Sequence, residues 1–248
     1  MRAVGGPNKF GVYTDMVPMS DSSRTISRRR VLAAGSAVTA GAWVAPSVLA
    51  LDRVSAATGS CGVAPLRFDW SSIAPTTALP PSITANDGTV VSFALTGDTN
   101  LLLAAFNGGV QTGTRGARAD YLGLGLTGAT GGQGVTLTMT FSKPVQACFE
   151  MLDIDRADGV WEDTVTVSAS LGGANVPISA ADFLPIGPSV AVVANDTIRG
   201  VGSEGNSSDL ANVDFNSPAE VDEIQLDYYD LTGFTGGQVI GIHDLRWC

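Results

Sequence analysis

The residues best suited to chemistry lie in one acidic segment, from Asp153 to Asp163. Carboxylates spaced this closely after a strand suit Ca²⁺, which takes roughly six to eight oxygen ligands in flexible geometry. The segment does not match an EF-hand, because Asp158-Gly159 come one residue late and Thr164 would occupy the last ligand position. We therefore predict Ca²⁺ as the cofactor, with these candidate ligands: Asp153, Asp155, Asp158, Glu162 and Asp163. The competing interpretation is a solvated loop whose carboxylates accept backbone N–H bonds in turns.

A metal site could also combine carboxylates that lie far apart in the sequence. In a jelly-roll arrangement, Asp69 and Asp244 would form such a pair. The chain contains a single histidine, His243. Zinc sites with two or three histidines are therefore excluded, and a histidine-dependent triad would have to use His243 itself.

A secreted hydrolase is one of two function classes that fit the polar side chains. Paired acids cleave glycosides when they are held roughly 5–10 Å apart. Glu150 or Glu162 could form such a pair with Asp155 or Asp227. Because these acids do not occupy an apolar stretch that would mark a proton donor, we predict no catalytic residue.

The second class, which we favour, is a secreted non-catalytic module that binds a glycan or another cell-surface component. Recognition of this kind needs aromatic faces beside polar groups. Trp161 lies inside the acidic segment, and Tyr228 and Tyr229 form an adjacent pair, so these three are the candidate ligand-binding residues. Adjacent strand residues point to opposite faces, so at most one of the two tyrosines lies in the core.

The elements that must position these side chains are predicted to be strands. Alternation is clearest at 135–141, where Val135, Leu137, Met139 and Phe141 share one face and threonines the other. The pattern restarts at 145–151 after Ser142-Lys143-Pro144, which predicts a turn between consecutive strands. Further strand-like runs at near-regular spacing are 66–70, 89–95, 101–106, 121–126, 165–171, 190–193, 211–215, 221–229 and 239–247. This pattern predicts an all-β fold, an antiparallel β-sandwich of jelly-roll type.

The N-terminal segment predicts where the protein is exported. Ser27–Leu32 resembles a twin-arginine signal, with three arginines before an apolar run about a dozen residues long. That run is shorter than the roughly 20 residues of a membrane-spanning helix. Cleavage near Ala50 or Ala56-Ala57 would divide the chain into a signal segment, 1–57, and one β-sandwich domain, 58–248. The resemblance implies export by the twin-arginine machinery to the cell envelope or the exterior, with no stable membrane span after cleavage.

The remaining domain also carries a resemblance. Its short motifs are Phe68–Trp70, Gly134–Phe141, Phe149–Asp155, Asp163–Val167 and Ile242–Trp247. Together they resemble bacterial extracellular β-sandwich modules of unassigned activity, which are similar in shape to carbohydrate-binding jelly rolls. The resemblance covers most of residues 61–248 and implies a fold more than a function.

Charge narrows the range of partners. Of the 14 basic and 24 acidic residues, seven basic and three acidic ones precede residue 58, which leaves residues 58–248 with a net charge of −14. Such a surface repels phosphate backbones, so nucleic acid and anionic membranes are not expected partners.

Three cysteines, Cys61, Cys148 and Cys248, lie in the exported domain. A disulfide between Cys61 and Cys248 would join the first and last strands outside the cell, and it is the pairing we predict. Cys61–Cys148 and Cys148–Cys248 remain alternatives. Cys61 could also be a lipid-attachment cysteine, although the residue three positions before it is not aliphatic.

Overall fold

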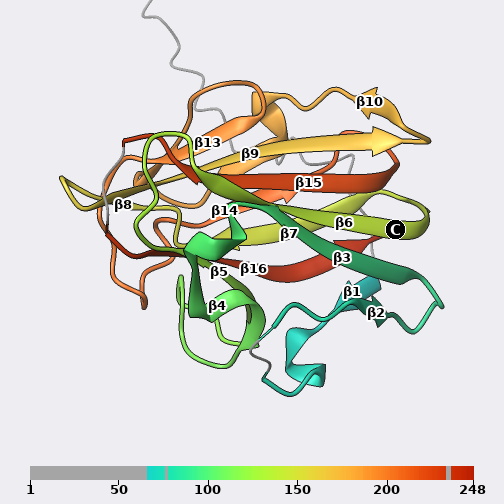
Figure 1. Ribbon diagram of the computed structural model, residues 1–248. Coiled ribbons are helices and arrows are strands. Elements are labelled where there is room, and N and C mark those ends of the chain that lie inside the picture. Colours follow the sequence, from blue (N-terminus) through green and yellow to red (C-terminus); the bar gives the residue numbers. More distant parts are fainter. Residues whose placement is uncertain (1–65, 76–77, 233–235) are drawn as a thin grey trace, which may run out of the picture. The chain divides into compact units, whose positions relative to one another are not determined.

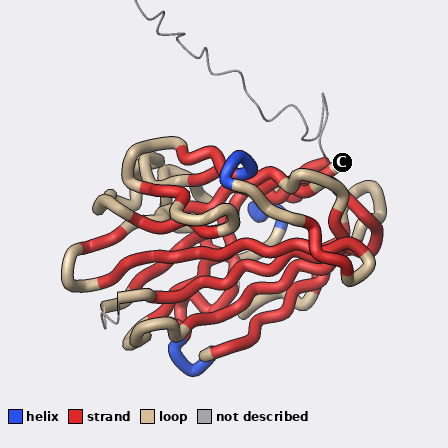
Figure 2. The backbone as a smooth tube through the Cα atoms, turned by 90° about the horizontal axis from the view of Figure 1, so that it is seen from above, coloured by secondary structure: helices blue, strands red, loops and turns tan. Residues whose placement is uncertain are grey.

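The computed structural model describes residues 66–75, 78–232 and 236–248, all of which belong to one compact unit of the chain, Leu51–Cys248. The predicted signal segment and Cys61 lie outside the described residues. Within the described part, helix is confined to three 3-10 turns, η1 (Trp70–Ser72), η2 (Thr99–Leu101) and η3 (Ala180–Asp182). Figure 2 shows that strands and their loops make up the rest of the described backbone.

Two antiparallel sheets form a sandwich, which confirms the predicted fold class (Figure 1). The first sheet has the order β11-β14-β7-β16-β5-β4, with β1 also paired to β16. Its strands are β11 (Phe183–Pro185), β14 (Val213–Asn216), β7 (Ala147–Leu152), β16 (Gln238–Trp247), β5 (Tyr121–Leu126), β4 (Leu102–Gln111) and β1 (Leu66–Phe68).

The second sheet has the order β12-β13-β9-β15-β6-β3-β2, with β8 and β10 also paired to β9. Its strands are β12 (Val190–Val192), β13 (Thr197–Gly200), β9 (Trp161–Leu171), β15 (Val221–Asp230), β6 (Gly134–Val145), β3 (Val90–Gly97), β2 (Ser82–Thr84), β8 (Arg156–Ala157) and β10 (Ala174–Val176). Figure 1 shows its long strands β9, β15, β6 and β3 side by side.

Alternating side chains of both sheets fill the space between them. Leu137 and Met139 of β6 are fully buried, as are Phe149 and Met151 of β7. The outer face of β6 carries the threonines, of which Thr136 and Thr138 are half-buried. This is the apolar-in, polar-out pattern of a sheet with one solvated face, so the predicted alternation is confirmed.

The turn predicted at Ser142–Pro144 is wrong. β6 continues through Val145, and β7 begins at Ala147 in the other sheet. The chain therefore crosses from one sheet to the other at Gln146 and reverses its direction there, because the start of β6 and the end of β7 both lie near the start of β9. Both Val145 and Ala147 are buried, so the restart of the apolar pattern marks a change of sheet, which the period of two cannot distinguish from a hairpin.

A β-bulge in β16 shapes one of the polar clusters described below. The pairing of β16 with β7 shifts register between His243 and Arg246, and Asp244 has a positive φ of 53°. Ile240, Ile242, Leu245 and Trp247 are buried, whereas the consecutive residues His243 and Asp244 are both half-buried. The extra residue places two neighbouring polar side chains away from the core, where a regular strand would bury one of them.

Candidate functional site

A polar pocket of about 260 Å³ forms where several strands of both sheets begin or end. We call it the end pocket. Asp153 and Asp155 follow the last residue of β7, Trp161 is the first residue of β9, and Gln238 is the first of β16. The complete lining is Arg115, Asp153, Asp155, Trp161, Ser203, Glu204, Asn206, Gly237, Gln238 and Val239.

Tight local geometry places the acidic segment at this pocket. Asp153 has a positive φ of 62°, and its backbone N–H donates to the buried side-chain Oδ1 of Asn212 at 3.1 Å. Asp158-Gly159 closes the hairpin in which Ala157 of β8 pairs with Trp161 of β9. Gly159 has a φ of 73°, a conformation that favours glycine.

Arg115 supplies the positive charge in the end pocket. It belongs to the β4–β5 loop, and its Nη1 donates to Oδ2 of Asp153 and, at 3.0 Å, to the backbone oxygen of Val239. Its guanidinium also lies 5.6 Å from the centre of the Phe106 ring. The charges of Arg115 and Asp153 therefore compensate each other.

The carboxylates of Asp155 and Glu204 are hydrogen-bonded but not ion-paired. Asp155 accepts from the Trp161 indole Nε1 at 3.0 Å and from the backbone N–H of Glu204 at 2.9 Å. Glu204 accepts from the hydroxyls of Ser189 and Ser208, at 2.5 and 2.8 Å. In the described part of the chain, neither carboxylate has a basic nitrogen within 4.0 Å, so the end pocket carries two uncompensated negative charges.

Two buried side chains of the end pocket have polar atoms without a hydrogen-bond partner in the described structure. They are Oδ1 of Asp153 and both amide atoms, Oε1 and Nε2, of Gln238. Asp153 is 3% exposed and Gln238 is 2% exposed. Buried polar groups in proteins are nearly always paired with protein, water or a bound ligand. These atoms therefore offer two acceptors and a donor to whatever fills the pocket, and Nε of the half-buried Arg115, which also has no partner in the described structure, offers a second donor.

Burial is the main reason why the pKa of Asp153 rises to about 6. The charge of Arg115 opposes this rise, and the nearby carboxylates of Asp155 and Glu204 add to it. The neighbouring Asp163 is fully enclosed, and burial raises its pKa well above the usual range although the Tyr228 hydroxyl donates to it. The acids of this region thus form a group of like charges in a poorly solvated place.

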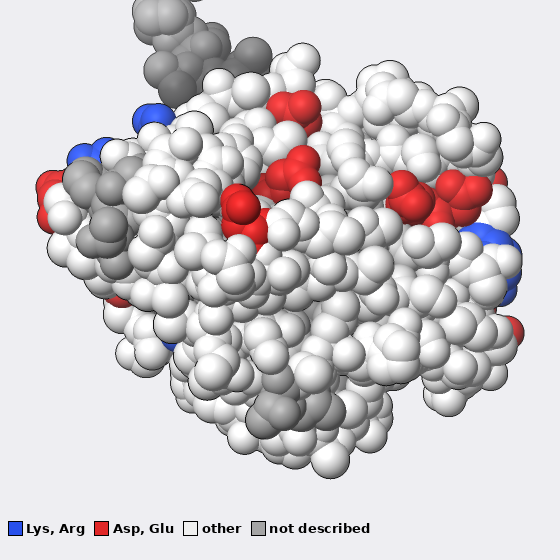
Figure 3. All heavy atoms as spheres, viewed as in Figure 1, with Lys and Arg blue, Asp and Glu red and all other residues white. Residues whose placement is uncertain are grey.

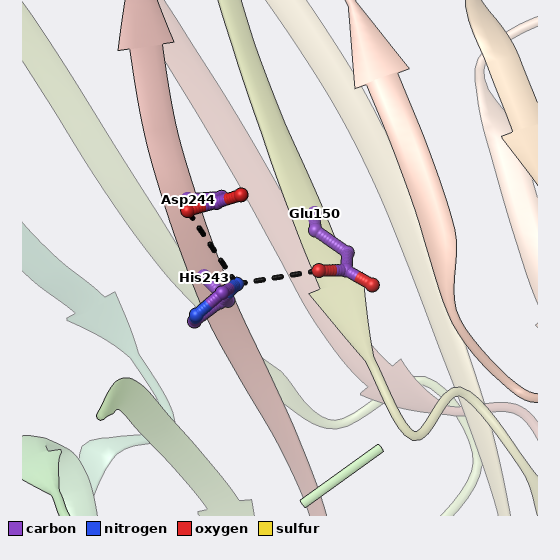
Figure 4. Close-up of side chains that lie close together, drawn as sticks. All are labelled: Glu150, His243 and Asp244. Atoms are coloured by element: carbon purple, nitrogen blue, oxygen red, sulfur yellow. Dashed lines mark hydrogen bonds and ion pairs between the residues drawn. The ribbon is translucent and has the colours of Figure 1, made fainter. Parts of the chain in front are cut away.

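A second group of polar residues, the histidine cluster, consists of Glu150, His243 and Asp244. Among the described residues it is the one group of three acids, histidines or cysteines whose ligand atoms all lie within 4.8 Å of one another. Figure 4 shows His243 between the two carboxylates, 3.2 Å from Glu150 and 3.9 Å from Asp244.

Protein groups already occupy the central carboxylate of the histidine cluster. Arg118 contacts both oxygens of Glu150 at 3.0 Å, and the Asn212 amide donates to one of them at 3.0 Å. Burial raises the pKa of Glu150, but the bond with His243, the charge of Arg118 and the bond from Asn212 outweigh it and lower the pKa. Glu150 therefore acts as a paired structural anion.

The five predicted calcium ligands do not converge on one point. Asp158 is exposed and pairs with Arg156 at 2.5 Å. Glu162 is buried between Arg156 and Arg199, with nitrogen–oxygen distances of 3.5 and 3.6 Å. Asp163 binds the Tyr228 hydroxyl at 2.7 Å and the backbone N–H of Asp155 at 3.1 Å. Asp153 and Asp155 are the two that share the end pocket.

The predicted pair Asp69 and Asp244 flanks the junction of the first and last described strands. Phe68 lies opposite Leu245 in the register of β1 and β16, and each acid is the next residue outward from this pair. Asp69 accepts from the backbone N–H of Ser71 at 2.9 Å and so caps η1. Asp244 belongs to the histidine cluster.

The three aromatic candidates occupy three different environments. Trp161 is half-buried and lines the end pocket. Tyr228 has none of its surface exposed, so its ring offers no face to a ligand in this structure. Tyr229 is half-buried and its hydroxyl lies 3.1 Å from that of Thr166. The expectation that at most one of the tyrosines lies in the core is confirmed.

The acids considered for a hydrolase have separate partners. Glu150 binds Arg118, Glu162 lies between two arginines, and Asp227 accepts from the Thr136 hydroxyl at 2.5 Å. Asp155 is the one that lines the end pocket.

Sequence reasoning missed Arg115, Glu204 and Gln238. Gln238 left a signal, because it shares a strand face with the buried Ile240 and Ile242, where an apolar residue is expected. Arg115 and Arg118 stand three residues apart in a glycine-containing loop of a domain poor in basic residues, which was a weaker signal. Glu204 left none, since it lies in a loop of glycine, serine and asparagine.

Of the two cysteines in the described part, Cys148 is buried and Cys248 is exposed, and they do not form a disulfide with each other. The predicted partner of Cys248, Cys61, lies outside the described residues. β1 and β16 do pair, with Leu66 opposite Trp247, so the first and last described strands are neighbours as expected.

Comparison with protein-family models and with curated proteins finds no match for this chain. Among the described residues, none of the helices has the length and apolar character needed to cross a membrane.

Proposed function

We propose that this chain is a secreted, non-catalytic β-sandwich module that binds a glycan, and that the end pocket receives one sugar of it. The observation that carries the proposal is the set of unpartnered polar atoms on Asp153 and Gln238, in a pocket that Trp161 also lines. Binding sites combine aromatic or apolar walls with a few convergent polar groups in this way.

The chemistry of the free atoms suits hydroxyl groups. A hydroxyl can donate to Oδ1 of Asp153 and accept from Nε2 of Gln238 at the same time, because it is both a donor and an acceptor. The volume of about 260 Å³ is just below the usual range of ligand pockets, roughly 300–1,000 Å³. It therefore suits one sugar ring and not a long stretch of polysaccharide.

A glycan array probed with the full chain tests this proposal. We expect hits that are lost in Gln238→Met, which keeps the volume of the side chain and removes its donor and acceptor. The matched control is Gln225→Met, in a polar groove on the outer face of the second sheet, which should keep the hits. An array without hits, or hits that both variants keep, would contradict the end pocket as a glycan site.

Export and disulfide formation belong to the same proposal. The twin-arginine-like segment would direct the chain to the cell envelope or the exterior, where Cys61 can pair with Cys248. Replacing Arg28 and Arg29 by lysine should retain the chain inside the cell. Intact-mass measurement after alkylation, with and without reduction, should show two thiols protected in the exported form.

Calcium remains a prediction for the acidic segment. If Ca²⁺ braces the module, melting curves should shift downward on addition of EDTA and recover with CaCl2. An unchanged melting temperature would remove calcium from the proposal and leave glycan binding in place.

One observation favours a second candidate, the hydrolase. Burial raises the pKa of Asp153 to about 6, and a carboxyl that keeps its proton in mildly acidic solution can donate it to a leaving group there. Its test is release of reducing ends from the glycans that bind. Release that is lost in Asp153→Asn would replace the binding module by an enzyme.

A further inference from the structure

The end pocket carries more negative charge than its own basic residue compensates. Three of its residues are carboxylates, Asp153, Asp155 and Glu204, against the single guanidinium of Arg115. Arg115 binds Asp153, so Asp155 and Glu204 keep their charges unpaired. Each oxygen of these two carboxylates accepts one hydrogen bond, yet a carboxylate oxygen can accept two, so both carboxylates can still receive a donor.

Gln238 is an independent sign that this charge faces a ligand. Only 2% of the surface of Gln238 is exposed, and the residue lines the pocket. Neither of its amide atoms has a hydrogen-bond partner in the described structure. A buried amide without partners destabilises the fold, so its presence calls for water or a ligand that bonds to it.

Trp161 is a third feature of the end pocket that favours a cation. Its indole N–H is fixed on Asp155 at 3.0 Å, which holds the half-buried ring beside the uncompensated carboxylate. Cations are attracted to the faces of tryptophan rings and to carboxylates, and the attraction grows where water is scarce.

A bare metal ion accounts for these features less well. The amide donor of Gln238 and the guanidinium of Arg115 both repel a cation that lacks its own hydrogen-bond acceptors. The space, about 260 Å³, corresponds to roughly eight or nine waters at about 30 Å³ each, which is much more than one ion fills. The hydroxyls of an organic cation, unlike a bare ion, can accept hydrogen bonds from these donors while its charge lies near Asp155 and Glu204.

We infer that the ligand of the end pocket is a cationic sugar, a hexosamine with a free ammonium group, whose charge lies near Asp155 and Glu204 and whose hydroxyls bond to Gln238 and Asp153. The inference rests on the proposed glycan function and specifies its ligand. The acidic character of the domain supports it, because a net negative surface raises the local concentration of cations. Figure 3 shows acidic side chains outnumbering basic ones on the face drawn.

Calorimetric titration of the full chain with glucosamine, glucose and N-acetylglucosamine at pH 7 tests the charge directly. We expect glucosamine to bind about tenfold more tightly than the two neutral sugars at low salt. The preference for glucosamine should shrink in about 0.5 M NaCl, because salt screens partly exposed charges.

Two variants that each remove one negative charge test whether the preference for glucosamine arises at the end pocket. Glu204→Gln should lower the affinity for glucosamine about tenfold, to that of the neutral sugars. Glu223→Gln changes the net charge of the chain equally but lies in the groove on the second sheet, so it should keep the preference.

The outcomes separate this inference from the function on which it rests. Equal binding of the three sugars would overturn the cationic ligand and keep the glycan module. Binding of none of them, together with an empty glycan array, would overturn both. Saturable binding of CaCl2 that is lost in Glu204→Gln and prevents glucosamine binding would assign the charge to a metal ion and overturn the inference.

Discussion

The end pocket and the histidine cluster are both rich in carboxylates, yet their polar atoms are used differently. In the histidine cluster, Glu150 is bonded by Arg118, Asn212 and His243. In the end pocket, one oxygen of Asp153 and the whole amide of Gln238 have no partner in the described structure. Proximity of acids alone therefore does not identify a binding site, because a carboxylate saturated by protein donors has nothing left to offer a ligand.

One residue connects the two regions. The amide of Asn212 donates to Glu150 and to the backbone oxygen of Gly116, at 3.0 and 2.8 Å, and accepts from the backbone N–H of Asp153. The loop that carries Arg115 and Arg118 is thereby held against both regions. Changes at Asn212 should affect both, whereas changes at Glu150 or Asp153 should affect one each.

The largest effect is expected for Asn212→Ala. It leaves a buried N–H of Asp153 and the carbonyl of Gly116 without this partner and removes one of the donors to Glu150, so we expect a loss of about 3–5 kcal/mol in the free energy of unfolding. Urea denaturation measures it, with Asn175→Ala as the control, since Asn175 is exposed. A loss below about 1 kcal/mol would show that the two regions are not held by this side chain.

The next effect is a pH dependence that comes from the end pocket. The pKa of Asp153 is about 6 in the folded chain and 3.8 in the unfolded reference, so the folded state binds the proton more tightly. Its contribution to stability is fully present below the unfolded pKa and is lost as the pH rises to about 6 and beyond. The stability of Asp153→Asn relative to the natural chain should therefore rise by about 2 kcal/mol between pH 4 and 7. A constant difference across that range would contradict the raised pKa.

The stability that Glu150 of the histidine cluster contributes should change with pH in the opposite direction. The pKa of Glu150 is lowered from 4.5, so its contribution is present above that pH and is lost as the pH falls below it. We expect Glu150→Gln to cost about 1–3 kcal/mol at pH 7, less than a fully enclosed ion pair, because Arg118 is 34% exposed. The cost should shrink in denaturation curves recorded below pH 4.5, and a cost that grows there would reverse the assignment.

The smallest effect separates binding from folding. Gln238→Met replaces a buried unpaired amide by an apolar side chain of similar shape, so the free energy of unfolding should rise by about 1 kcal/mol while glycan binding is lost. Thermal melting and the array read these two quantities on one sample. A destabilised variant would mean that Gln238 serves the fold.

The strands were predictable because their side chains repeat with a period of two. β5 was predicted with the observed bounds, and β15 and β16 to within one residue. The short strands β2, β8, β10, β11 and β13 were not predicted as strands. Segments of two to four residues hold too few side chains to show a period, and their pairing depends on the neighbouring strand.

The candidate site was predictable in part. The acidic segment and Trp161 were found from their residue types, and Asp153, Asp155 and Trp161 do line the end pocket. Asp158, Glu162 and Asp163 belong to the same segment but have other partners, because a hairpin and a strand turn successive side chains in different directions.

Residue types and their local spacing were enough to establish the two-layer β fold and the acidic character of the domain. Which carboxylates are free to bind a ligand depends instead on contacts between distant parts of the folded chain. Arg115 reaches Asp153 across 38 positions of sequence, and Glu204 reaches Asp155 across 49. Such contacts depend on where loops from both sheets meet in space, and no local pattern encodes that meeting.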